Sequence, residues 1–156
     1  MDQRARKVPA LIRAVSPLGR MLLRLGVPMG PDILMTVRGR KSGLPRTVAV
    51  ALVDIEGRRW VIGAYGNVHW VLNLRATREA VIDVGRRPER VSAVELSREE
   101  AAAFYRDALP PFIAGLPLFL RAVTIATLRS GSPDILDHPA RAAQDRPVFE
   151  LRPMSD

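Results

Sequence analysis

The sequence predicts a mainly β protein of the α+β class, in which a small barrel-like sheet carries peripheral helices. Short segments rich in β-branched residues recur along the chain, separated by turns that contain glycine. Two of these segments, residues 47–55 and 58–65, are apolar at successive positions. Strands with this pattern need cover on both faces, which favours a closed or doubly covered sheet.

The length and composition favour one domain with its own core. The chain has 156 residues, of which 47% are hydrophobic, and a core of that size needs no disulfide or metal staple. We therefore expect residues 1–156 to form a single domain. The absence of cysteine excludes disulfides and zinc–sulfur sites. His69 and His138 are too few for a metal site, so no metal is expected.

The amino-terminal segment, residues 1–30, is predicted to be a basic amphipathic helix. An apolar stripe over residues 9–25 consists of Leu11, Val15, Leu18, Leu22 and Leu25. Three arginines, Arg13, Arg20 and Arg24, lie largely off that face. Ser16 and Pro17 provide an N-cap and a first-turn proline, so two short helices are the alternative.

Six strands are expected. They cover residues 33–37, 47–55, 58–65, 79–84, 89–96 and 147–151. Glu56 and Gly57 form the turn between the second and third strands, and residues 85–88 form the turn between the fourth and fifth.

Helices are expected between these strands. Residues 68–76 form a short helix, and the capping box at residues 97–100 opens another that ends near Leu109. Residues 110–130 form an apolar helical cover over the barrel mouth or a contact with another subunit. A membrane span is the weaker alternative, because it needs about 20 apolar residues and this stretch contains Pro117 and Arg121.

The charge of the chain is concentrated in its first third. The net charge is +8, and residues 1–46 hold ten cations and two anions, whereas the remaining residues hold 14 of each sign. This asymmetry indicates an anionic partner: a phosphate-bearing ligand, a nucleic acid or a membrane surface. An aromatic content of 5% and the lack of a groove-reading motif disfavour nucleic acid.

The loop Arg38–Thr47, with the sequence RGRKSGLPRT, is the strongest local signal for a binding site. It combines four cations with two glycines between two strand-like segments. Glycines let the backbone approach a ligand closely, and cations with free N–H groups bind anions. The alternative is a solvated hairpin tip whose arginines only maintain solubility.

Two stretches together, residues 36–47 and residues 64–76 (AYGNVHWVLNLRA), resemble the deazaflavin-dependent nitroreductase family. The resemblance covers roughly residues 30–105 and the final strand. It implies a split β-barrel of the flavin- or deazaflavin-binding type and coenzyme F420 as cofactor, with FMN as the alternative. It also implies hydride transfer to an apolar acceptor such as a quinone, a nitro compound or an activated enone.

The matched residues fit a cofactor with several negative charges. Lys41 supplies a mobile charge and Arg46 a bidentate fork for phosphate, while Arg40 lies beside them or faces solvent. The resemblance implies that the end of the third strand lines the flat ring system, with Trp70 as a wall and Asn73 orienting the ring. The implied cofactor-binding residues are Arg40, Lys41, Ser42, Arg46, Ile62, Gly63, Ala64, Tyr65, His69, Trp70 and Asn73.

Several of these residues also have structural interpretations. Trp70 could be a core anchor, Asn73 a capping or turn residue, and His69 a packed, hydrogen-bonded side chain. Tyr65 could donate a proton or a hydrogen bond to the acceptor, or be structural. Because the cofactor carries out the chemistry, we assign no catalytic residue from the sequence. Val50, Ala51 and Leu52 predict an apolar acceptor pocket.

Three classes of function are therefore considered. The favoured one is an F420-dependent oxidoreductase. The second is a non-catalytic binding protein of the same fold that holds a flavin, haem or fatty acid, and the third is a basic protein of nucleic acids or membrane surfaces. No signal-peptide pattern is present, so we expect a cytoplasmic protein, with association to the inner face of the membrane and a homodimer as additional expectations.

Overall fold

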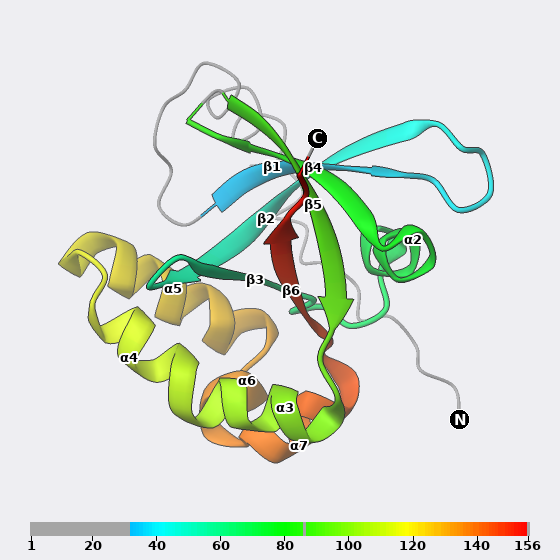
Figure 1. Cartoon of the computed structure of the whole chain (residues 1–156). Coiled ribbons are helices and arrows are strands. Elements are labelled where there is room, and N and C mark those ends of the chain that lie inside the picture. The colour runs from blue at the N-terminus through cyan, green and yellow to red at the C-terminus, as the bar shows by residue number, and fades with distance from the viewer. Residues whose placement is uncertain (1–31, 86, 156) are drawn as a thin grey trace.

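The computed structural model describes residues 32–85 and 87–155 (Figure 1). The predicted amino-terminal helix lies outside the described residues. Six antiparallel strands close into a barrel in the order β1-β2-β3-β6-β5-β4. The strands are β1 (Asp32–Arg38), β2 (Pro45–Ile55), β3 (Arg58–Ile62), β4 (Glu79–Val84), β5 (Arg87–Glu95) and β6 (Val148–Pro153). The predicted barrel-like sheet with peripheral helices is confirmed.

The two faces of the central strands pack against two different clusters. Leu52, Val61 and Phe149 belong to the cluster inside the barrel, whereas Val53 and Trp60 belong to a second cluster between the barrel and the helices. Since side chains alternate along a strand, β2 and β3 supply both clusters at once. This alternation explains why these segments are apolar at successive positions.

The turns follow the local sequence signals. Glu56 and Gly57 have φ angles of 53° and 84°, as a two-residue hairpin turn with the twist of its strands requires. The Gly57 N–H also donates to Asp54 Oδ1 at 3.1 Å. At the start of the helical region, the Glu100 N–H donates to Ser97 Oγ at 3.1 Å, so the predicted N-cap is present.

Five α-helices and one π-helical turn lie together along one side of the barrel (Figure 1). They are α3 (Arg98–Ala103), the π-helix η1 (Phe104–Ala108), α4 (Leu109–Ala114), α5 (Leu118–Gly131), α6 (Asp134–Asp137) and α7 (Pro139–Asp145). The predicted single apolar stretch is two helices, α4 and α5, because Pro117 interrupts it. Within the described ranges, no helix combines the length and apolar character that a bilayer crossing requires.

The third strand is shorter than predicted. It ends at Ile62 rather than residue 65, because the chain then enters a turn. The Gly63 N–H donates to the Pro147 carbonyl at 2.8 Å, and the Gly66 N–H donates to the Gly63 carbonyl at 3.0 Å. Gly66 has a φ of 79°, which favours glycine. Tyr65 therefore lies in a turn.

Candidate functional site

A cavity of about 790 Å³ lies between the β1–β2 hairpin and α2 (His69–Thr77). Both elements are on the side of the barrel away from helices α3 to α7 (Figure 1). The cavity is lined by Val37, Gly39, Arg40, Lys41, Ser42, Arg46, Val48, Ala49, Tyr65, Val68, His69, Trp70 and Asn73. Eight of the eleven residues predicted for the site therefore lie together.

Backbone hydrogen bonds within the loop close the turn at the tip of the hairpin. The Gly39 N–H donates to the Leu44 carbonyl and the Gly43 N–H donates to the Gly39 carbonyl, both at 2.8 Å. Gly43 has a φ of 70°, and a Cβ on Gly39 would lie 2.7 Å from Ser42 Oγ. The turn therefore favours glycine at position 43, whereas a side chain on residue 39 would require the Ser42 hydroxyl to move. Ser42 Oγ accepts from the Leu44 N–H at 3.2 Å, which leaves its hydroxyl hydrogen available to a ligand.

Asn73 on α2 holds this loop in place. Its Oδ1 atom accepts from the Arg40 backbone N–H at 3.1 Å and from Arg40 Nη1 at 2.8 Å. The Asn73 side chain is buried, and its neighbours Val71 and Leu74 pack in the barrel interior and fix the helix. Sequence reasoning gave Asn73 a role toward the cofactor and did not foresee this contact with the loop.

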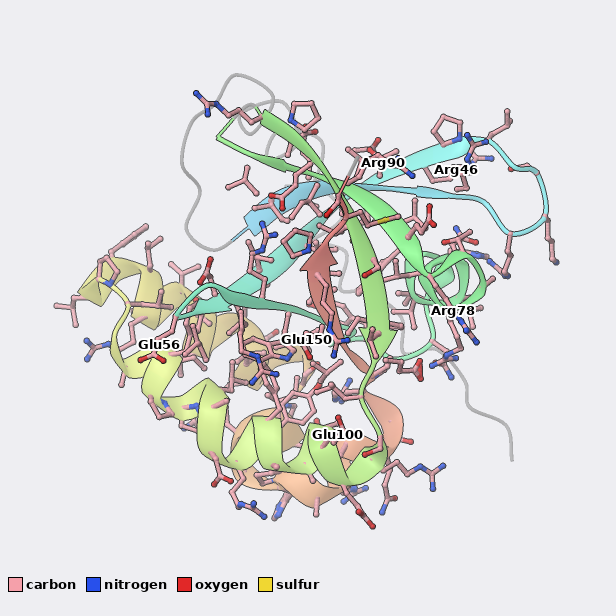
Figure 2. All side chains as sticks on the ribbon, in the orientation of Figure 1. Arg46, Glu56, Arg78, Arg90, Glu100 and Glu150 are labelled. Atoms are coloured by element: carbon pink, nitrogen blue, oxygen red, sulfur yellow. The ribbon has the colours of Figure 1, made fainter. Side chains whose placement is uncertain are left out.

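The hairpin end of the cavity is positively charged. Arg40, Lys41 and Arg46 line it, their side chains are exposed, and none of the lining residues is acidic. Figure 2 shows Arg46 where the projecting loop rejoins the barrel on β2. Among the described residues, no carboxylate lies within ion-pair distance of Lys41 or Arg46. This end of the cavity therefore suits an anion.

The other end of the cavity is apolar and aromatic. Val48, Val68 and Trp70 are half-buried and pack against the cluster inside the barrel. The Trp70 ring lies 6.5 Å from that of Phe149, so Trp70 is both a cavity wall and a core anchor. Burial raises the pKa of the Tyr65 hydroxyl above its usual value, and the Arg146 charge partly offsets this rise. Tyr65 is therefore a protonated hydrogen-bond donor at neutral pH.

Ile62, Gly63 and Ala64 do not line the cavity. Ile62 and Ala64 pack against the cluster between barrel and helices, and a Cβ on Gly63 would lie 2.9 Å from Pro147 Cγ. Of the four residues at this strand end that were predicted to line a flat ring, Tyr65 alone lines the cavity. The physical reason is the early end of β3, which turns the chain toward the helices.

The cavity also has lining residues that sequence reasoning missed. Val37, Val48 and Ala49 lie on the two strands that flank the loop. Their closeness in sequence to the cations of the loop is the signal that could have identified them as lining residues. The expected apolar positions on β2 were instead Val50 to Leu52, of which Val50 and Leu52 point into the barrel interior. In the described part of the chain, no three Asp, Glu or His side chains gather where a metal could bind.

The chain is similar to one protein family and to several solved structures. A family model described as F420H(2)-dependent quinone reductase matches residues 11–110. No curated protein matches the sequence. A solved structure described as a domain-swapped dimer is 19% identical, with a TM-score of 0.50, and the match covers 92% of this chain and 100% of that one.

Two further solved structures are similar. One is a putative 5-nitroimidazole antibiotic resistance protein from Bacteroides thetaiotaomicron VPI-5482, 10% identical, with a TM-score of 0.51 and coverage of 87% and 80% of the two chains. The other is an F420-H2 dependent reductase (FDR-A), 22% identical, with a TM-score of 0.46 and coverage of 78% and 94%. At 10% identity, the similarity to the Bacteroides protein supports the fold alone.

Proposed function

The chain belongs to the F420H(2)-dependent quinone reductase family, and from this premise we propose that its cavity binds the reduced deazaflavin beside an apolar acceptor. The protein is an F420-dependent oxidoreductase with a split β-barrel fold. The acceptor class is a quinone, a nitro compound or an activated enone. One observation carries the site assignment: a single cavity joins a cationic, carboxylate-free end to an apolar, aromatic end.

The residues present fit the deazaflavin. The coenzyme has a phosphodiester and an oligoglutamate tail, which suit Lys41, Arg46 and the Ser42 hydroxyl. Its flat ring suits the wall that Trp70 and Val48 provide. The cavity of about 790 Å³ also lies in the usual size range of ligand pockets, about 300–1,000 Å³.

The chain's own residues bind, orient and exclude water. When bound, the reduced deazaflavin supplies the hydride for the acceptor. Trp70 and Val68 keep water from the apolar end, which strengthens polar interactions there. The Tyr65 hydroxyl donates a hydrogen bond to an acceptor oxygen, and His69 lies at the rim in the first turn of α2, where it contacts cofactor or acceptor. Arg40 contributes charge while Asn73 fixes its position.

A turnover assay tests this function. The protein is mixed with reduced deazaflavin and then with menadione, and the visible absorbance of the oxidised cofactor is followed. We expect that absorbance to return much faster than without protein. Tight cofactor binding with no acceleration would instead favour a non-catalytic split-barrel binding protein.

The cofactor preference is a separate prediction. We expect the protein to bind oxidised F420 more tightly than FMN, because the loop and the α2 stretch together resemble the deazaflavin family. Titrations can follow tryptophan fluorescence, since Trp70 lines the cavity whereas Trp60 packs against Phe104 on the helix side of the barrel. A Trp70→Phe variant should lose most of the quenching. Equal or tighter FMN binding would contradict the preference.

Membrane association is proposed for the amino-terminal segment. Residues 9–25 carry a leucine stripe flanked by arginines, and such segments bind anionic lipid surfaces. On α5, Leu118 and Phe119 are about three-quarters exposed and would add apolar contact. We propose a cytoplasmic protein at the inner face of the membrane.

We also propose a homodimer. Sedimentation, which measures the mass of the particle in solution, tests this proposal.

Vesicle flotation tests the membrane proposal. We expect the protein to float with vesicles of anionic lipid. A variant with Arg13, Arg20 and Arg24 replaced by glutamine should float less and should bind the cofactor as before. Unchanged flotation of this variant would contradict a role for these three arginines in membrane association.

A further inference from the structure

A buried polar network lies next to Tyr65, among residues that do not line the cavity. Arg146, between α7 and β6, is only 1% exposed, and its Nε and Nη2 atoms donate to Asp134 Oδ1 at 3.0 and 2.8 Å. Its Nη1 atom donates to the carbonyl of Ala64, and the Ser132 hydroxyl donates to the same carbonyl. Two donors from the helical region therefore converge on the peptide group that joins Ala64 to Tyr65.

The Tyr65 ring itself is held by α5. A Cβ on Gly131 would lie 2.8 Å from Tyr65 Cε1 and 3.3 Å from its hydroxyl oxygen. Only glycine at position 131 lets the ring lie this close to the helix backbone. The ring and the preceding carbonyl are thus both fixed by residues 131–146, which are distant from the cavity's other walls in sequence.

Stability alone is a weak explanation for this arrangement. Taking a guanidinium and a carboxylate out of water costs several kcal/mol per ion, and apolar replacements of a buried pair are often at least as stable. The pair of Arg146 and Asp134 instead directs an N–H donor to the Ala64 carbonyl and so fixes the position of that peptide group. This carbonyl belongs to Ala64, the residue before Tyr65. Tyr65 provides the one aromatic hydroxyl among the residues that line the cavity.

We propose that Arg146, oriented by Asp134 and assisted by Ser132, is a positioning residue that fixes the Tyr65 hydroxyl toward the acceptor. This inference rests on the proposed function, since it takes Tyr65 as the donor to the acceptor. The helical region then sets the acceptor geometry, while the β1–β2 loop holds the cofactor.

Kinetics of two mild variants test the proposal. Ser132→Ala removes one donor from the Ala64 carbonyl, and Gly131→Ala displaces the Tyr65 ring. Each should lower kcat with menadione about tenfold, since a misplacement of about 1 Å can cost about a hundredfold. The affinity for oxidised F420 should stay unchanged. In a Tyr65→Phe background, Ser132→Ala should cause no further loss, because coupled residues are non-additive.

Tyr105→Phe is the matched control. The Tyr105 hydroxyl donates to the backbone carbonyl of Arg146 at 3.0 Å, so its loss weakens the same buried region without touching the Ala64 carbonyl. We expect a lower Tm and unchanged kcat. If Ser132→Ala and Gly131→Ala also lowered only the Tm, the network would be structural and the proposal would be overturned.

A titration gives a second readout that needs no cofactor. The chain has two tyrosines, so in the Tyr105→Phe variant the ultraviolet absorbance of tyrosinate reports Tyr65 alone. Adding Ser132→Ala or Gly131→Ala should bring the raised pKa of Tyr65 toward its usual value, because the ring gains solvent. A shift in a protein that showed no turnover would support the positioning and contradict the proposed function. An unchanged titration would overturn the positioning.

Discussion

Replacing Arg46 with alanine should weaken the binding of oxidised F420 by about 1.5–3 kcal/mol, the range for a hydrogen bond to a charged group. Arg46 is the second residue of β2 and lines the cavity, and its exposed side chain can present its planar fork to a phosphate. Lys41→Ala should cost less, because a solvated ammonium is heavily screened. Titration at low salt measures both effects.

Arg129→Ala is the charge-matched control for Arg46→Ala. Arg129 is exposed in the last turn of α5 and does not line the cavity. Its replacement removes the same charge and should leave cofactor affinity nearly unchanged. The thermal stability of all these variants without cofactor should also stay close to that of the parent protein. Equal affinity losses for Arg46→Ala and Arg129→Ala would mean that only the net charge matters.

Replacing Asn73 with alanine should affect both stability and binding. The free energy of unfolding should fall by about 0.5–1.5 kcal/mol, the net contribution of a hydrogen bond, because the Arg40 donors that lose their partner belong to an exposed residue and can be hydrated. Cofactor affinity should also fall about tenfold or more, because the cationic loop loses its attachment to α2. Urea unfolding and cofactor titration measure the two effects separately.

Asn73→Asp separates the two roles of this residue. A carboxylate keeps an acceptor for both Arg40 donors, so the stability should be largely retained. The added negative charge should still weaken the binding of an anionic cofactor. If Asn73→Ala bound the cofactor as tightly as the parent protein, the loop would not need α2 for binding.

Local signals account for most of what could be predicted from the sequence. The turn at Glu56 and Gly57 and the cap at Ser97 depend on residues a few positions apart, and both are present in the structure. The apolar pattern of residues 47–55 predicted a strand covered on both faces, and β2 does supply two clusters. The loop and the α2 stretch were predicted to form one site, and residues of both line the same cavity.

Contacts between distant residues could not be predicted in this way. Arg146 and Asp134 are 12 positions apart, and Arg146 contacts the carbonyl of Ala64 from 82 positions away. Neither residue stands in a pattern that distinguishes it from the many other charged residues of the chain. The end of β3 at Ile62 likewise depends on Pro147, which packs against Gly63 only in the folded barrel.

The salt dependence of cofactor affinity tests the deazaflavin site most directly. Exposed charges are screened beyond about 10 Å at 0.1 M salt, so affinity for oxidised F420 should fall as salt rises if Lys41 and Arg46 hold its anionic groups. The Lys41→Ala, Arg46→Ala double variant should bind weakly, and its affinity should change little with salt. Undiminished binding by this variant, with the salt dependence of the parent protein, would contradict the assignment of the cationic loop as the cofactor site.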